Sequence, residues 1–144
     1  MKIFDCFMFY DEDLVIDLRL NILNKYVNEF IIVESKYTHS GKKRELLFDI
    51  NKYSNFKNKI NYIALDNEPY NLEKVKNSDT EDKTNSKYIM NALKRENFQR
   101  NEITKGLTKA NPEDLILISD VDEIPNLSNL DVSKVNNEIV LFKQ

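Results

Sequence analysis

Hydrophobic residues fall into short runs that are separated by longer polar stretches. Four runs have the length and the branched side chains of strands buried on both faces: residues 2–9, 30–34, 59–65 and 115–118. A further run at residues 139–142 predicts one more strand near the end of the chain. Strands that alternate with helices or long crossovers form a mainly parallel sheet with both faces covered. The pattern therefore predicts an α/β fold, with flanking helices, in a single domain over residues 1–144.

Two other segments carry hydrophobic residues at helical spacing. The first predicts a helix with Asp11 as its N-cap, and its recurring positions are Leu14, Leu18, Ile22 and Tyr26. The second predicts a long helix over residues 87–109, which ends before Pro112 because a residue preceding proline disfavours the helical conformation. Residues 66–87 are polar throughout and predict a mobile loop.

Composition limits the classes of function. Hydrophobic residues make up 41% of the chain and charged residues 31%, which is ordinary for a soluble globular protein. The net charge of −3 predicts no nucleic-acid partner, since proteins of that class usually carry a basic face. Cys6 is the only cysteine, so the chain has no internal disulfide and fits a reducing compartment. No apolar run reaches the length of a membrane helix, and we expect a cytoplasmic protein.

Acidic residues gather directly after the run at 115–118. Ligands of α/β sheets bind beyond the carboxyl ends of the strands. Asp120 and Asp122 lie two residues apart, a spacing that points both side chains the same way in an extended chain. Such oxygen ligands suit Mg²⁺ or Mn²⁺. Either ion takes its remaining ligands from water and substrate phosphates. The alternative is a solvated turn, in which aspartate is common, and the residues alone leave both possibilities open.

The glycines exclude two ways of binding phosphate. With only Gly41 and Gly106, the chain holds neither a dinucleotide-binding G-x-G-x-x-G motif nor a P-loop. The phosphates of a bound nucleotide would therefore be met by a metal or by basic side chains. A basic loop that could approach a diphosphate contains Tyr37, Lys42, Lys43 and Arg44.

Two further positions are candidates for ligand contacts. Glu96 and Arg100 can pair at i, i+4 on the long helix, and they fall on the centre line of an apolar stripe made of Ile89, Leu93, Ile103 and Leu107. An ion pair on an apolar face carries a desolvation cost, which favours a polar support or a ligand contact near the site. Glu34 ends the second strand and could accept hydrogen bonds from a base or a ribose. His39 has no neighbour that would make it part of a nucleophile and base pair.

Four segments together resemble glycosyltransferase family 17, whose best-known members are β-1,4-mannosyl-glycoprotein N-acetylglucosaminyltransferases. The segments are "MKIFDCFMFYDEDLVIDLRLNIL", "FIIVESKYTHSGKKRELLF", "RENFQRN" and "LILISDVDEIPN". The resemblance implies a GT-A fold, a Rossmann-like sheet whose D-x-D motif holds a divalent metal, Mn²⁺ or Mg²⁺, against a sugar nucleotide. It also implies UDP-N-acetylglucosamine as the donor, a glycan as the acceptor and inversion at the anomeric carbon.

On this resemblance Asp120 and Asp122 are the D-x-D pair and metal ligands, and Asp120 also contacts the substrate. Glu123 is an accessory acid, and Glu34 and Arg100 lie along the nucleotide side of the cleft. The residues identify no general base. GT-A transferases carry an acceptor-binding half after the D-x-D strand, and we expect most of that half to be missing because the sequence ends at Gln144.

Other functions remain open from the sequence. One is a non-catalytic sugar-nucleotide-binding fragment, or a subunit that completes its fold by self-association or with a partner chain at an exposed sheet edge. Another is a haloacid-dehalogenase-like phosphatase, which also places D-x-D after an apolar strand. There a threonine or valine usually occupies the position that Ile124 holds here.

Overall fold

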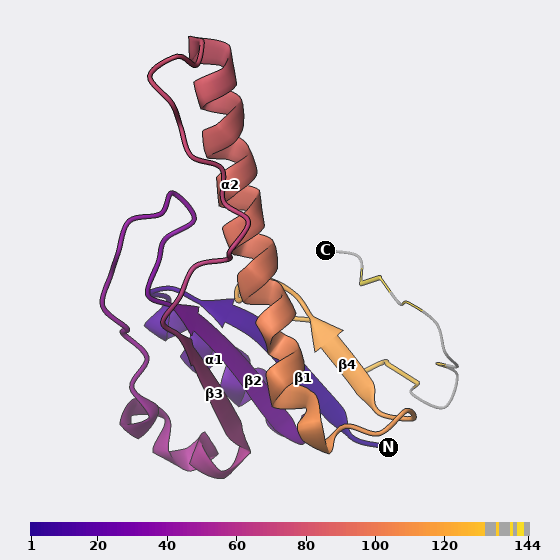
Figure 1. Ribbon diagram of the computed structural model, residues 1–144. Helices are drawn as coiled ribbons and strands as arrows, with labels where there is room; N and C mark the ends of the chain where they lie inside the picture. Colours follow the sequence, from indigo (N-terminus) through magenta and orange to yellow (C-terminus); the bar gives the residue numbers. More distant parts are fainter. Residues whose placement is uncertain (132–134, 136–138, 140, 143–144) are drawn as a thin grey trace.

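A four-stranded parallel sheet is the centre of the computed structural model, which describes residues 1–131, 135, 139 and 141–142. The strands lie in the order β3-β2-β1-β4, and every neighbouring pair is parallel (Figure 1). Their bounds are Ile3–Phe9 for β1, Glu29–Ser35 for β2, Ile60–Leu65 for β3 and Leu115–Ile118 for β4. The predicted α/β class and parallel sheet are confirmed. The strand predicted at 139–142 includes Val140, which lies outside the described residues, so it stays a prediction.

Helical elements cover both faces of the sheet. One face carries α1 and the 3-10 helix η1, and the other carries α2 and the 3-10 helix η2 (Figure 1). Their bounds are Asp13–Leu23 for α1, Ile50–Lys59 for η1, Glu81–Asn101 for α2 and Glu102–Lys109 for η2. The strands read as continuous apolar runs because successive side chains enter opposite layers. On β2, for example, Ile31 packs in the α2 layer and Ile32 in the α1 layer.

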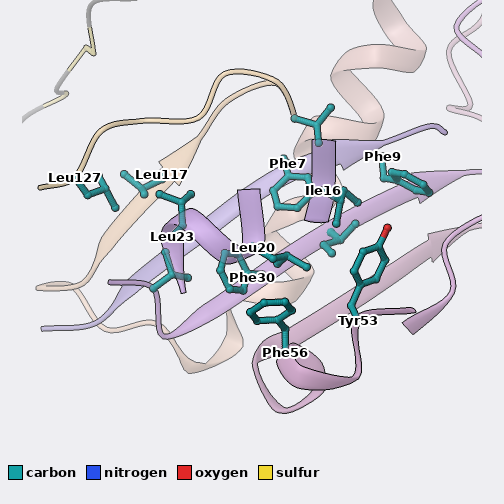
Figure 2. Packing of buried hydrophobic residues seen from close by; sticks show 13 residues of the cluster. Phe7, Phe9, Ile16, Leu20, Leu23, Phe30, Tyr53, Phe56, Leu117 and Leu127 are labelled. Atoms are coloured by element: carbon teal, nitrogen blue, oxygen red, sulfur yellow. The ribbon is translucent and has the colours of Figure 1, made fainter. Parts of the chain in front are cut away.

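The larger hydrophobic cluster lies between the sheet and α1. Figure 2 shows α1 and η1 sending Ile16, Leu20, Leu23, Tyr53 and Phe56 toward Phe7, Phe9 and Phe30 of the sheet. On the opposite face, η2 comes close to β2 at Gly106. A Cβ atom at Gly106 would lie 2.6 Å from Ile31 Cγ2, so only glycine permits this approach.

The first helix lies where the spacing predicts, but Asp11 is not its N-cap, and the recurring apolar positions do not form its buried face. Leu14, Leu18 and Ile22 have exposed fractions of 83%, 53% and 43%. The buried side chains of α1 are Ile16, Arg19, Leu20 and Leu23. The helical spacing fits two adjacent stripes, and the stripe that packs on the sheet contains an arginine, which a hydrophobic pattern does not count.

The second helix begins earlier than predicted and changes type near its end. Thr80 caps α2, since its hydroxyl accepts a hydrogen bond from Lys83 N, and the chain tightens into η2 from Glu102 onward. The upper part of the predicted apolar stripe is not buried, because Ile89 and Leu93 are 62% and 46% exposed. This half of α2 projects past the sheet (Figure 1). None of the described helices is long and apolar enough to cross a membrane.

The polar segment before α2 is a loop, and α2 holds it along its side. The Asn91 side chain accepts a hydrogen bond from Glu73 N and donates one to Glu73 O, each at 2.8 Å. Lys87 donates to Lys74 O and pairs with Asp79 at 2.5 Å. Three polar residues are buried on α2, and these contacts account for two of them, Lys87 and Asn91. The third, Gln99, donates to Val33 O of β2.

Candidate functional site

A pocket of about 720 Å³ opens at the carboxyl edge of the sheet. Side chains from the ends of β1 and β2, the start of α1, the second half of α2 and the turn after β4 line it, among them Tyr10, Ser35, Glu96, Asp120 and Asp122. Ligands of parallel α/β sheets bind at this edge. The volume lies within the range of about 300–1,000 Å³ that is common for small-molecule sites.

The turn after β4 brings the D-x-D acids to this pocket. Asp120, Val121 and Asp122 all line it. The two acids have exposed side chains, whereas Val121 is 7% exposed and also packs in the core. Two backbone hydrogen bonds close the turn, from Glu123 N to Asp120 O at 3.0 Å and from Ile124 N to Asp122 O at 3.1 Å. The turn therefore separates the two acids from the core while keeping both on the pocket side.

Glu123 contributes to the turn itself. Its Oε2 accepts a hydrogen bond from Asp120 N at 3.2 Å, and it is not among the residues that line the pocket. This geometry supports the conformation of the D-x-D segment. The substrate contact predicted for Glu123 stays a prediction.

The predicted pair on the long helix is present and lies beside the acids. Arg100 Nη2 is 3.3 Å from Glu96 Oε1 and also 3.3 Å from Asp120 Oδ1. Both side chains of the helix pair are 36% exposed, so solvent screens the interaction and a surface pair of this kind is worth at most about 1 kcal/mol. The position of the pair matters more than its strength, because the pair places the Arg100 guanidinium group against Asp120, the first acid of the motif.

The place of Glu34 at the strand end predicts that its side chain faces the rim of the pocket. This prediction is wrong. The Glu34 side chain has no exposed surface, and its carboxylate accepts hydrogen bonds from Leu47 N at 2.8 Å and Phe48 N at 3.1 Å. The Tyr62 hydroxyl donates to it at 2.8 Å, and Arg44 Nη1 lies 2.9 Å away. Burial, and then the hydrogen bond to Glu34, raise the pKa of Tyr62, so this hydroxyl stays a donor. Glu34 thus anchors the loop after β2.

That loop forms one wall of the pocket. Tyr37, Thr38, His39 and Arg44 line it, whereas Lys42 and Lys43 of the predicted basic loop are exposed and outside the lining. Arg44 donates to the carbonyls of Ser35, at 2.9 Å, and Tyr10. Its guanidinium carbon also lies 4.4 Å from the centroid of the Tyr10 ring. Arg44 therefore joins the exits of β1 and β2.

Arg19 is the residue of this region that the hydrophobic pattern missed. It is fully buried on α1, pairs with the buried Asp5 of β1 and reaches the D-x-D turn. A signal was present in the sequence. Asp5 is a lone acid in an otherwise apolar strand, and a buried carboxylate needs a cationic or hydrogen-bonding partner.

The donor set of the site fits a divalent cation only in part. Within the described part of the chain, no three Asp, Glu, His or Cys side chains come together as a metal site. Mg²⁺ commonly keeps several waters and binds through one or two carboxylates plus substrate phosphates. Asp120 and Asp122 match that smaller requirement, so the residues present fit a metal that arrives with a diphosphate.

The parallel sheet, with a ligand-sized pocket at its carboxyl edge, is that of a Rossmann-like α/β protein. The sequence model of glycosyltransferase family 17 matches residues 1–141, and the chain belongs to this family. The protein is therefore a glycosyltransferase, whose class acts on a sugar donor and a glycan acceptor. Comparison with curated proteins gave no match, and neither did comparison with solved structures. Family membership removes the support for the phosphatase alternative.

Proposed function

We propose that the chain transfers N-acetylglucosamine from UDP-N-acetylglucosamine to a glycan acceptor, with inversion at the anomeric carbon and with Mn²⁺ or Mg²⁺ as cofactor. The observation that carries the proposal is the position of Asp120 and Asp122, which line the pocket at the carboxyl edge in a family 17 chain. In a cytoplasmic protein the acceptor would be a bacterial or viral glycan instead of an N-glycan of the secretory pathway.

The leaving group sets the main chemical demand. A bound divalent cation would stabilise the negative charge that develops on the departing UDP. Asp120 and Asp122 are the residues that would hold this cation. Arg100 adds positive charge beside Asp120, where its guanidinium group can face a diphosphate. On the opposite wall, Arg44 is bound to backbone carbonyls and to Glu34, and it acts on the shape of the pocket.

Inversion also requires a general base for the acceptor hydroxyl. Among the residues that the structure describes, two carboxylates other than the D-x-D pair line the pocket, those of Glu12 and Glu96. Glu12 Oε2 accepts hydrogen bonds from Tyr10 N at 2.9 Å and Asp11 N at 3.1 Å, and Glu96 pairs with Arg100. Each has a structural partner, and we assign neither of them as the base.

Thermal unfolding with UDP-N-acetylglucosamine, with and without Mn²⁺, tests the donor site. A ligand at about 100 times its dissociation constant adds about 2.7 kcal/mol to the free energy of unfolding, which raises the melting temperature measurably. We expect the rise to require Mn²⁺ and to vanish in the double variant Asp120→Ala/Asp122→Ala. The variant Asp17→Ala/Glu113→Ala is the control, because it removes two exposed acids that do not line the pocket.

Release of UDP in the presence of glycan acceptors then separates transfer from binding alone. A Mn²⁺-dependent shift followed by acceptor-dependent UDP release supports the proposed transferase. A shift without UDP release under any acceptor supports the non-catalytic sugar-nucleotide-binding alternative. A folded chain that shows no shift with any UDP-sugar contradicts the proposed donor site.

A further inference from the structure

Arg19 is a cation with no exposed surface, and its charge is matched inside the core. Arg19 Nε lies 2.8 Å from Asp5 Oδ2, and Arg19 Nη2 lies 2.8 Å from Asp5 Oδ1. This two-pronged contact is the strongest geometry for an arginine and a carboxylate. The guanidinium carbon also lies 4.7 Å from the centroid of the Phe7 ring. Asp5, itself fully buried, therefore fixes both the charge and the orientation of the guanidinium group.

The remaining donors of Arg19 point at the turn after β4. Arg19 Nη1 lies 2.8 Å from Asp120 O, 3.1 Å from Val121 O and 3.1 Å from Glu123 O. Arg19 Nη2 donates to Ser119 Oγ at 2.7 Å, and that hydroxyl donates in turn to Glu123 O at 3.0 Å. Carbonyl oxygens from three nearby residues converge on one nitrogen, so the backbone of the turn curls around the guanidinium group.

This arrangement determines where the side chains of the turn go. With the carbonyls of Asp120 and Val121 directed at Arg19, Val121 packs in the core and the acids on either side of it line the pocket. Without Arg19, the carbonyl oxygen of Val121 and the carboxylate of Asp5 would lose the donor described here. The carbonyls of Asp120 and Glu123 would keep only their contacts within the turn, from Glu123 N and Ser119 Oγ. The turn would then relax toward solvent, and the acids would lose their common direction.

We propose that Arg19 is a positioning residue of the donor site, which holds the turn over residues 119–124 so that Asp120 and Asp122 face the diphosphate and its cation. The ligand in this inference rests on the proposed function, whereas the effect on the turn does not. Residues that orient metal ligands typically change metal affinity about 10- to 100-fold when they are replaced. A residue with only a structural role would lower stability and leave the affinity of the folded chain unchanged.

The test compares Arg19→Lys with Phe56→Ala in the full chain. Lysine keeps the positive charge and loses the two-pronged contact and the geometry of the five donors. Phe56 belongs to the same hydrophobic cluster, lies on η1 and does not line the pocket, so its replacement lowers stability at a distance from the turn. Order parameters from ¹⁵N relaxation of the metal-free chain report the rigidity of residues 119–124, and calorimetry reports Mn²⁺ binding in the presence of UDP.

In Arg19→Lys we expect the order parameters of the turn to fall from about 0.85, typical of a rigid backbone, toward about 0.6. We also expect Mn²⁺ affinity to fall about 10- to 100-fold. In Phe56→Ala both should stay at wild-type values. Asp5→Asn weakens the contact that orients Arg19 and leaves the described contacts within the turn in place, so it should loosen the turn in the same direction, which decides the question if Arg19→Lys does not fold.

Two results would overturn the inference. One is a turn as rigid in Arg19→Lys or Asp5→Asn as in the wild type, and the other is equal loosening in Phe56→Ala. A wild-type chain that binds neither Mn²⁺ nor UDP would contradict the proposed function instead. The relaxation data of the metal-free chain would still decide whether Arg19 holds the turn.

Discussion

Replacing Glu34 with glutamine tests whether this buried carboxylate anchors a loop or binds a ligand. Its oxygens accept hydrogen bonds from two backbone N–H groups and from the Tyr62 hydroxyl, and they form an ion pair with the Arg44 guanidinium group. Glutamine has nearly the same shape, but it keeps one acceptor oxygen and turns the other into an NH₂ donor. The substitution therefore removes half of the acceptor capacity without opening a cavity.

The least costly orientation of the glutamine places its NH₂ group where Oε2 was. The Tyr62 hydroxyl can rotate there and accept, whereas Phe48 N–H loses its acceptor. One buried N–H without a partner costs about 1–3 kcal/mol. The loss of the charge also weakens the pair with Arg44, whose side chain is 11% exposed. We expect a total of about 3 kcal/mol, the lower end of the range of about 3–5 kcal/mol for removing one partner of a buried ion pair.

Urea unfolding at pH 7, followed by far-UV circular dichroism, measures this loss. With a slope of about 2 kcal/mol per molar urea, the midpoint should fall by about 1.5 M. Glu45→Gln is the control, since Glu45 is exposed and the same charge is removed, and its effect should stay within about 0.5 kcal/mol. A Glu34→Gln chain that keeps the wild-type midpoint but loses UDP-sugar affinity would refute the anchoring role and establish a ligand contact.

Three further predictions concern the acids and the cysteine. Asp122→Ala should lower the turnover of a competent enzyme about 10²- to 10³-fold, measured as UDP release beside Asp17→Ala; an unchanged rate removes Asp122 from the site. The hydrogen bond from Lys87 lowers the pKa of Asp79 from its ordinary 3.8 to about 2. The stabilisation from the ionised Asp79 carboxylate is therefore complete above about pH 4 and lost as the pH falls toward 2. The difference in melting temperature between wild type and Asp79→Asn should close over that interval, and a constant difference contradicts this. Burial, and then the charge of Asp5, raise the pKa of the Cys6 thiol to about 12. Ellman's reagent should thus label Cys6 at pH 8 only as fast as the chain unfolds, and rapid labelling of the native chain, compared with a sample in urea, would contradict its burial.

The strands could be predicted because a sheet covered on both faces leaves an unbroken apolar run in the sequence. The run at 115–118 is the clearest case, and the rule that ligands bind beyond the carboxyl ends directed attention to Asp120 and Asp122. Both acids line the pocket. This part of the prediction needed only the local pattern and a general property of parallel sheets.

The polar contacts could not be predicted in the same way, because each joins residues that are far apart in the chain. Periodicity placed α1 correctly, yet the apolar stripe through Leu14 and Leu18 is exposed. The stripe that is buried holds Arg19, whose partners are Asp5 and a turn about a hundred residues later. A pattern that treats arginine as a surface residue has no means of placing it against the sheet.

Two buried ion pairs flank the site, and their cost suggests why they are there. Hydrophobic residues of similar volume often replace a buried ion pair without loss of stability, so such a pair is weak evidence for a role in stability alone. Here each acid lies on a central strand, Asp5 on β1 and Glu34 on β2. Each binds an arginine, Arg19 or Arg44, through side chains that are at most 11% exposed.

What the two arginines share is the use of their remaining donors. Arg19 binds the carbonyls of the D-x-D turn, and Arg44 binds the carbonyls of Ser35 and Tyr10, where β2 and β1 end. Loops at a sheet edge have few backbone hydrogen-bond partners of their own, and hydrophobic residues in place of the ion pair could not supply hydrogen-bond donors. A guanidinium group can bind a carboxylate and several carbonyl oxygens at once. The two pairs therefore connect the rigid strands to the opposite walls of the pocket, which is the support that a site needs if its ligand groups are to be held in place before the ligand arrives.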